Sequence, residues 1–171
     1  GGTKESDVVL KIGKYLESML KEVDLEVRFT RMSDKYISLG DRVEFANNFG
    51  ADYFLSIHVN SASDNTVRGV EVWQYNNDDK HLNEFCSSLC NEISGIFNIR
   101  NRGVKLSKGL YVLKNTSMKA ALLEVDFISN SFCEKDLNND DNLKAVARVT
   151  KDNVLKLYNI KTSEPILYKV C

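Results

Sequence analysis

Three residues with side chains suited to acid–base or metal chemistry lie where surface charge alone would not place them. Glu124 lies inside the apolar run 120–127, where a carboxylate is costly to bury unless it is paired, hydrogen-bonded or close to a metal ion. His58 lies near the carboxyl end of a second apolar run, 52–60, and Glu5 lies at the start of an amphipathic segment. Carboxylates and an imidazole are suited to general acid–base catalysis and to zinc ligation.

Each of these residues also has a purely structural interpretation. Glu124 could form a buried ion pair with an arginine such as Arg31 or Arg42. His58 could be a core histidine with satisfied hydrogen bonds, and Glu5 could complement the dipole of the helix that it begins. Considered one residue at a time, the pattern leaves both interpretations open.

Helix and strand patterns alternate along the chain. The apolar spacing in 4–22 is close to 3.6 residues and predicts an amphipathic helix. The alternation predicts an α/β fold, a three-layer sandwich with a largely parallel central sheet flanked by helices. Ligands of such sheets gather beyond the carboxyl ends of the strands, where His58 and Glu124 are expected. Further helices are expected at 42–50, 80–97 and 142–158, and strands at 25–29, 52–60, 68–75, 104–106, 110–113 and 120–125.

The composition is that of one globular domain. The chain has 171 residues, 43% hydrophobic and 27% charged, with a net charge of -1. Its positive charges are scattered among acids, which argues against a nucleic-acid partner. The apolar runs are shorter than the roughly 20 residues that a membrane span needs, and no secretory signal is visible.

The four cysteines match neither a zinc ribbon nor a dense disulfide framework. Cys86 and Cys90 lie one helical turn apart on an apolar face, which favours a packing role. Two thiolates without convergent partners would leave a tetrahedral metal ion incomplete. The other two cysteines are Cys133 and Cys171.

A series of short sequence blocks carries a resemblance that extends from Lys4 to about Tyr158. The blocks are KESD at 4–7, TRMSD at 30–34 followed by Leu39 and Arg42, AN at 46–47, AD at 51–52, SIHVNSA at 56–62, NRGVK at 101–105 and LEVDFISN at 123–130. In this order they resemble the signature blocks of the N-acetylmuramoyl-L-alanine amidase family called Amidase_3. So many blocks in the family's order make chance agreement improbable.

The resemblance implies a zinc enzyme that acts on peptidoglycan. In the family two histidines and a glutamate hold zinc, and the match places the glutamate at Glu5 and the second histidine at His58. Glu124 matches the catalytic glutamate, a general base and then general acid acting on zinc-bound water. The implied reaction is hydrolysis of the amide bond between N-acetylmuramic acid and L-alanine. The implied setting is the cell wall or exterior of a bacterium, as an autolysin or a prophage endolysin.

Other residues in the matching blocks have expected roles around this site. Asn60 and Ser61 could orient a ligand or bind substrate, or could simply end their strand in a turn. The segment 101–103 is expected to line the cleft. Arg31, Asp34 and Arg42 are expected to form a structural network beneath the site.

The sequence departs from the family at its start. In the other members of the family, the first zinc ligand is a histidine in a block resembling Gly-His-Gly-Gly, which follows an N-terminal strand. This chain begins at Gly1, so both that strand and that histidine are expected to be missing, leaving an exposed sheet edge. Three explanations for the missing histidine stay open: a truncated chain, a longer chain that begins earlier, or a variant that has lost its metal. The first two are favoured. His81 is expected to be a solvated surface residue and not a substitute ligand.

The chain is expected to divide near residue 160. Residues 1–160 are expected to be an N-terminally incomplete amidase catalytic domain. Residues 161–171 hold the only proline, Pro165, and are expected to be a linker and the start of a C-terminal cell-wall-binding domain. The run 166–171 is similar to the opening strand of sporulation-related repeat domains, which bind glycan strands.

Two alternatives to an amidase stay open. A zinc carboxypeptidase or aminopeptidase on a related fold would need a substrate-carboxylate site or a second metal site, and the sequence shows neither. A metal-free peptidoglycan-binding or regulatory relative would keep the fold without the chemistry. Zinc content and release of fragments from purified cell walls distinguish these alternatives.

Overall fold

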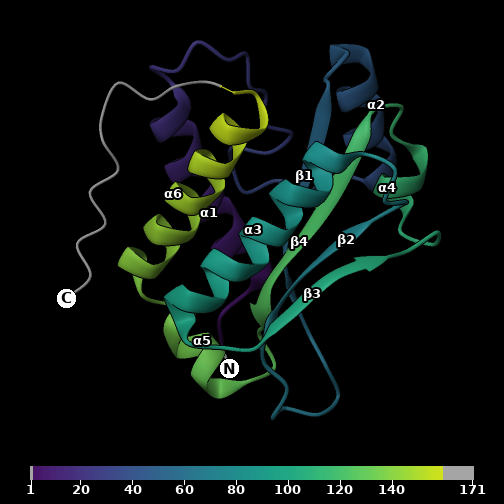
Figure 1. The fold of residues 1–171 in the computed structure, drawn as a ribbon. Coiled ribbons are helices and arrows are strands. Elements are labelled where there is room, and N and C mark those ends of the chain that lie inside the picture. The colour runs from purple at the N-terminus through teal and green to yellow at the C-terminus, as the bar shows by residue number, and fades with distance from the viewer. Residues whose placement is uncertain (1, 160–171) are drawn as a thin grey trace.

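The chain folds around a four-stranded β-sheet with helices on both faces (Figure 1). The computed structural model describes residues 2–159. The elements, in chain order, are α1 (Glu5–Leu20), α2 (Leu39–Phe49), β1 (Tyr53–Asn60), β2 (Val70–Gln74), α3 (Lys80–Phe97), β3 (Asn101–Leu106), α4 (Tyr111–Asn115), β4 (Lys119–Phe127), α5 (Ser131–Leu137) and α6 (Asp140–Leu157).

The strands of the sheet follow the order β1-β4-β2-β3. β1 pairs parallel with β4 and β2 pairs parallel with β3, whereas β2 and β4 pair antiparallel. The predicted α/β sandwich with a largely parallel central sheet is therefore confirmed. The antiparallel pairing at its centre was not predicted, because an alternating apolar pattern does not encode the direction of a strand.

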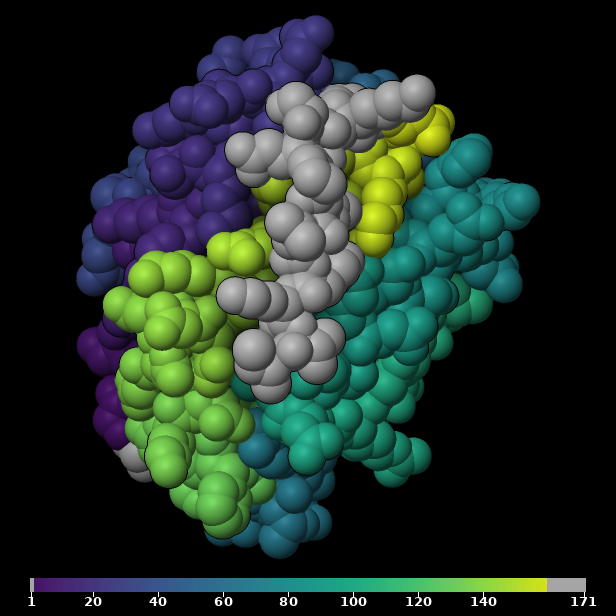
Figure 2. Space-filling model, turned by 60° about the vertical axis from the view of Figure 1, so that its left-hand side comes forward, coloured from purple at the N-terminus to yellow at the C-terminus, as the bar shows by residue number. Residues whose placement is uncertain are grey.

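One face of the sheet is covered by three helices that bury the main hydrophobic core. α1, α3 and α6 pack on this face, and Figure 2 shows the yellow-green α6 between the purple α1 and the teal α3. Ile12, Leu89 and Val146 come from the apolar stripes of these helices and are fully buried in one cluster with Val72 and Leu123 of the sheet. The helical spacing that predicted these stripes therefore places the core.

The opposite face of the sheet is covered by helices over only part of its area. α2 and α4 bury Val43, Val112 and Leu122 in a smaller cluster near the start of β4. Because side chains alternate along a strand, Glu124 shares this face with Leu122, while Leu123 faces the main core. Glu124 lies beyond the smaller cluster and lines a cavity of about 240 Å³. A buried strand thus presents a carboxylate at an open part of the sheet.

The sequence fixes both ends of α2, the helix that leads into β1. The Ser38 hydroxyl accepts a hydrogen bond from the Asp41 backbone N–H, and the Asp41 carboxylate accepts one from the Ser38 backbone N–H. Gly50 ends the helix with φ of 70°, a left-handed conformation that glycine adopts without strain. The predicted helix end at Gly50 is confirmed.

Two local predictions differ from the structure, and one short helix was not predicted. Residues 110–113 were expected to be extended, but they lead into the short helix α4, since a four-residue apolar run is compatible with either element. The helix α5 was not predicted. Residues 25–29 alternate as a strand does, yet they belong to no strand, because a strand needs a neighbour for its backbone hydrogen bonds.

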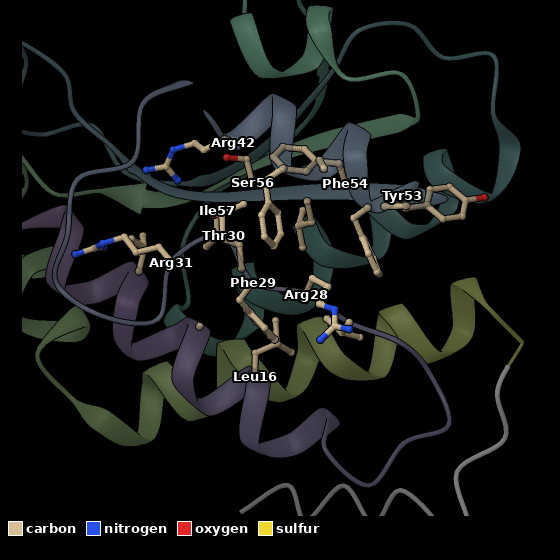
Figure 3. A pocket seen from close by; sticks show the side chains of 18 of the residues that line it. Leu16, Arg28, Phe29, Thr30, Arg31, Arg42, Tyr53, Phe54, Ser56 and Ile57 are labelled. Carbon is tan, nitrogen blue, oxygen red and sulfur yellow. The ribbon is translucent and has the colours of Figure 1, made fainter. Parts of the chain in front are cut away.

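A large cavity lies along the outer side of β1. Among the described residues β1 pairs only with β4, so its other edge is open, as expected for a sheet without its first strand. The cavity has a volume of about 790 Å³ and is lined both by β1 and by the segment 25–30. Figure 3 shows the side chains that line it, among them Leu16 of α1, Phe29 of that segment and Ile57 of β1. Both apolar and charged side chains line it, and its volume lies along the edge of β1 that pairs with no described strand.

Within residues 2–159, no helix is both long enough and apolar enough to cross a membrane. The predicted linker and strand-like run at 161–171 lie outside the described residues. The division of the chain near residue 160 therefore stays a prediction.

Candidate active site

A row of three titratable side chains crosses the open face of the sheet. His58 of β1 stands opposite Glu124 of β4, and Glu124 stands opposite Glu71 of β2. Side chains at directly opposed positions project from the same face. Three neighbouring strands therefore bring an imidazole and two carboxylates together, although the residues are far apart in the sequence.

Glu5 joins this row from the first turn of α1. Its Oε1 atom lies 2.8 Å from Nδ1 of His58 and accepts a hydrogen bond of 3.2 Å from the backbone N–H of Val59. The hydrogen bond with His58 lowers the pKa of Glu5 below its ordinary value and outweighs the opposite effect of burial. The second ring nitrogen of His58, Nε2, lies 2.8 Å from the Ser56 hydroxyl. Glu5 is thus an ionised partner of His58 as well as a first-turn acid.

Glu124 is the carboxyl group in this row that lacks a cation partner. Burial raises its pKa to about 7, with His58 opposing the rise and the charges of Glu5 and Glu71 adding to it. Its Oε2 atom is buried and has no hydrogen-bond partner among the described residues. A carboxyl group that exchanges its proton near neutral pH is suited to acid–base chemistry.

The arginines considered as ion-pair partners of Glu124 bind elsewhere. Arg31 pairs with Asp34 at 2.9 Å and donates to the Ser6 carbonyl at 2.8 Å, which ties the 30–38 loop to the start of α1. Arg42 donates to the Ile37 carbonyl at 3.2 Å. Figure 3 shows both arginines beside the large cavity. The structure thus supports their expected structural role, and neither arginine forms the ion pair with Glu124.

Asn60 connects the end of β1 to Glu71. Its side-chain amide donates to Glu71 Oε1 at 3.2 Å, and its carbonyl oxygen accepts from the Ser61 backbone N–H at 2.7 Å. With Trp73, Ser107, Leu110 and Glu124, Asn60 lines the cavity of about 240 Å³. Asn60 therefore ends its strand and borders this cavity, and a role in binding substrate stays a prediction.

Sequence reasoning missed Glu71, which is only 2% exposed. Its Oε2 atom accepts hydrogen bonds from Arg102 Nε at 2.8 Å and from Lys105 Nζ at 2.5 Å. Its Oε1 atom accepts one from the Trp73 indole N–H at 3.1 Å. Arg102 of the segment 101–103 thus contacts Glu71, but that segment lines neither the large cavity nor the cavity of about 240 Å³, and its expected place in the cleft stays a prediction. The available signal was the same as for Glu124, a carboxylate between two buried apolar neighbours of one strand.

Among the described residues, His81 and the cysteines lie away from this chemistry. His81 is exposed at the start of α3, as expected. Cys86, Cys90 and Cys133 are buried with free thiols. Burial raises the pKa of Cys86 to about 12, which opposes the thiolate form that binds metals. The packing role expected for Cys86 and Cys90 agrees with their burial.

The donor atoms at Glu5 and His58 fit part of a zinc site. A carboxylate oxygen and an imidazole nitrogen are donors that zinc takes, and the buried, unpartnered Oε2 of Glu124 marks a nearby position for a polar partner. No group of three or more metal-binding side chains converges within residues 2–159. The large cavity reaches both Glu5 and His58, so a strand that lay in it could bring a further donor to the pair.

The fold and this row of side chains define an α/β domain with a candidate acid–base site near the carboxyl ends of the neighbouring parallel strands β1 and β4. The chain belongs to the N-acetylmuramoyl-L-alanine amidase family, Amidase_3, whose model matches residues 1–156. The resemblance seen in the sequence blocks is therefore confirmed.

Individual relatives agree with this assignment. A sporulation-specific N-acetylmuramoyl-L-alanine amidase of Bacillus subtilis is 32% identical over 172 positions, covering 99% of this chain and 66% of that protein. An endolysin of Bacillus phage SPP1 is 33% identical over 167 positions, covering 94% of this chain and 60% of that protein. The chain thus spans slightly less than two thirds of the length of these relatives.

Solved structures show the same fold. The catalytic domain of the amidase CwlV from Bacillus (Paenibacillus) polymyxa var. colistinus superposes with a TM-score of 0.85 at 29% identity, covering 94% of this chain and 88% of that one. An N-acetylmuramoyl-L-alanine amidase from Clostridium difficile 630 superposes with a TM-score of 0.85 at 31% identity, covering 95% and 88%.

Proposed function

We propose that this chain is the catalytic part of a peptidoglycan amidase, which hydrolyses the amide bond between N-acetylmuramic acid and L-alanine. Family membership supports the reaction. The observation that carries the assignment of roles is the buried Glu124 carboxyl with a pKa near 7, opposite His58 on the neighbouring strand. A cell-wall or extracellular setting in a bacterium, as autolysin or endolysin, follows from the substrate and agrees with the names of the relatives.

In this proposal Glu124 moves the protons of the reaction. As a carboxylate it accepts a proton from the attacking water, and as an acid it then donates a proton to the departing amine of L-alanine. Its pKa close to neutral allows both states at the same pH. Replacing such a group typically costs 10²- to 10⁴-fold in rate, so Glu124→Gln is expected to lower kcat by about that factor.

Glu5 and His58 are proposed as two ligands of a zinc ion. When bound, zinc supplies Lewis-acid polarisation of the scissile carbonyl and lowers the pKa of a bound water to about 7. The Val59 N–H and the Ser56 hydroxyl orient the Glu5 carboxylate and the His58 ring by hydrogen bonds. A third protein donor is proposed to come from a strand in the cavity beside β1.

Zinc titration by calorimetry tests the ligand assignment without turnover. Glu5→Gln and His58→Gln are expected to weaken zinc binding at least tenfold, whereas Asp7→Asn should not change it. Asp7 is the matched control because it is an exposed acid in the same first turn of α1. Equal affinities for all four proteins would contradict the assignment.

Release of dye-labelled fragments from purified cell walls tests the reaction. The parent protein is expected to release fragments with new N-terminal L-alanine, and Glu124→Gln is expected to slow the release by about 10²- to 10⁴-fold. The alternative function is that of a metal-free relative that binds cell walls without cutting them. One observation favours it: within residues 2–159, Glu5 and His58 are the only two metal-binding side chains that meet at the site. Wall binding with neither zinc nor cleavage would establish that alternative.

A further inference from the structure

A pair of cations lies at the end of the active-site row that is remote from His58. Arg102 Nε and Lys105 Nζ both contact Glu71 Oε2, at 2.8 Å and 2.5 Å. We call Glu71, Arg102 and Lys105 the basic cluster. One carboxylate faces two cations, so the cluster keeps a net positive charge of about one unit at neutral pH. It adjoins Glu124, because β2 pairs with β4 and β3 pairs with β2.

The cations of this cluster are held in place yet retain donors for a ligand. Arg102 donates to Glu71 through Nε, and its two terminal nitrogens donate to no residue that the structure describes. Its guanidinium lies 5.0 Å from the ring centre of Phe127, and the Lys105 ammonium lies 5.0 Å from that of Trp73. The two side chains remain 26% and 30% exposed. Two cations fixed by a buried acid and by aromatic rings form a preorganised anion site.

The position of the cluster sets which part of a substrate can reach it. Neighbouring strands lie about 4.8 Å apart, so the cluster lies one to two strand spacings, roughly 5–10 Å, from Glu124. An extended peptide advances about 3.4 Å per residue. A group about two or three residues beyond the cleaved amide, and so one or two residues beyond L-alanine, therefore falls at the cluster. The Lys105 ammonium lies over the Trp73 ring, and Trp73 lines the cavity of about 240 Å³ together with Glu124. Trp73 therefore connects the basic cluster to the surface around Glu124.

We propose that Arg102 and Lys105 bind a carboxylate of the peptide stem, one or two residues beyond the L-alanine whose bond is cleaved. This inference rests on the proposed amidase function. The geometry supports it, because both cations lie on the strand next to β2, are held by Glu71 and are partly exposed. The cluster thus makes the enzyme selective for stems with a free carboxylate over stems in which it is amidated.

Equilibrium binding of two small ligands, measured with a chelator present so that the metal-dependent cleavage does not proceed, tests the proposal without turnover. One ligand is N-acetylmuramoyl-L-alanyl-D-isoglutamate with both carboxylates free, and the other is its diamide. The full chain is expected to bind the diacid about tenfold more tightly than the diamide, as loss of a charge-assisted hydrogen bond predicts. Arg102→Gln and Lys105→Gln should each remove most of this preference. Lys108→Gln is the matched control, since Lys108 is an exposed lysine over the Tyr75 ring, outside the cluster.

Three results would overturn the proposal. The first is equal binding of diacid and diamide by the unmodified protein. The second is an equal loss of affinity for both ligands in the cluster variants, which would indicate a merely structural role. The third is loss of the preference in Lys108→Gln as well. Circular dichroism identifies any variant that fails to fold, and Lys105→Met then provides a second substitution at the more exposed cation.

The same measurements separate this inference from the proposed function. If the parent protein cleaves cell walls but binds the diacid and the diamide equally well, the amidase function stands and the carboxylate site is wrong. If it neither cleaves walls nor binds either ligand, both are wrong. A preference for the diacid that depends on Arg102 and Lys105 supports the site directly.

Discussion

Glu124 and Glu71 stand directly opposite each other on the antiparallel strands β4 and β2, and of the two only Glu71 is paired with cations. Burial acts to raise the pKa of Glu71, but hydrogen bonds from Lys105 and Arg102 outweigh it and hold the pKa below its ordinary value. Burial without such partners raises the pKa of Glu124 to about 7. Two adjacent carboxyl groups therefore differ in protonation at mildly acidic pH, the arrangement that separates an acid–base catalyst from a fixed charge.

The raised pKa of Glu124 predicts a specific pH dependence of stability. The folded state binds this proton more tightly than the unfolded state, whose pKa is near the ordinary 4.5. The stabilising contribution is complete below pH 4.5 and is lost as the pH rises through about 7. Relative to Glu124→Gln, the metal-free protein should therefore lose on the order of 3 kcal/mol between pH 4.5 and pH 8.

Urea unfolding in the presence of a chelator measures this difference at each pH. Glu44→Gln is the control, since Glu44 is an exposed acid on α2. Parallel stability curves for the wild type and Glu124→Gln would show that Glu124 does not take up a proton in this range.

Replacing Glu71 is expected to destabilise the fold through the cations that it leaves behind. In Glu71→Gln the charges of Arg102 and Lys105 lose their carboxylate while remaining mostly buried. Breaking a fully buried pair costs about 3–5 kcal/mol, and partial exposure here reduces the expected loss of unfolding free energy to about 2 kcal/mol. Lys105→Met in the Glu71→Gln background should recover part of this loss, which a double-mutant cycle measures.

An exposed pair provides the comparison for Glu71. Glu26 and Arg28 are 2.8 Å apart at the surface, and Glu26→Gln should change the unfolding free energy by less than about 1 kcal/mol. If Glu26→Gln and Glu71→Gln lowered the unfolding free energy equally, burial would not explain the expected cost of Glu71→Gln.

The sequence was most informative where burial follows from local pattern. The apolar runs around His58 and Glu124 predicted buried strands, and a charged side chain within such a run marked each position. The stripe that includes Ile12 likewise predicted the buried face of α1. These features depend on neighbours within one element, which a single sequence displays.

Features that depend on pairing between distant segments could not be predicted. The contacts of Glu71 with Arg102 and Lys105 exist because β2 lies between β4 and β3, and no local pattern encodes that order. The segment 25–29 shows the converse, since its alternation suits a strand but no described neighbour completes its hydrogen bonds. The amidase roles of Glu5 and His58 were suggested by family resemblance, and the structure added their direct contact.

Two glycines should respond to alanine in opposite directions. Gly13 lies within α1, and a Cβ atom added there would meet no atom within 4 Å. Gly13→Ala should therefore raise the unfolding free energy by about 0.5–1 kcal/mol, through helix propensity. At Gly69, φ is 134° and a Cβ atom would lie 2.6 Å from the Arg100 carbonyl oxygen, so Gly69→Ala should lower it by about 1–3 kcal/mol. Thermal unfolding of both variants tests this, and a stabilised Gly69→Ala would contradict it.

The loop between β1 and β2 should lose its protection when its buried anchor is weakened. Asp126 accepts hydrogen bonds from Arg68 Nε at 2.9 Å, from Arg68 Nη2 at 2.7 Å and from the Gly69 backbone at 2.7 Å. Arg68 Nη2 also contacts Asp136 at 2.7 Å. The Asp126 side chain is 1% exposed and that of Asp136 is 32% exposed. Asp126→Asn should therefore cost about 3 kcal/mol and Asp136→Asn clearly less.

Hydrogen exchange followed by mass spectrometry distinguishes a local effect of Asp126→Asn from a global one. Peptides from residues 61–69 should exchange faster than those of α3 and α6, because the anchor ties this loop to β4 and α5. The loop continues directly from Asn60, which bonds to Glu71, so its release should also loosen the edge of the active site. Uniform acceleration throughout the protein, or equal costs for the two substitutions, would show that Asp126 does not act as a local anchor.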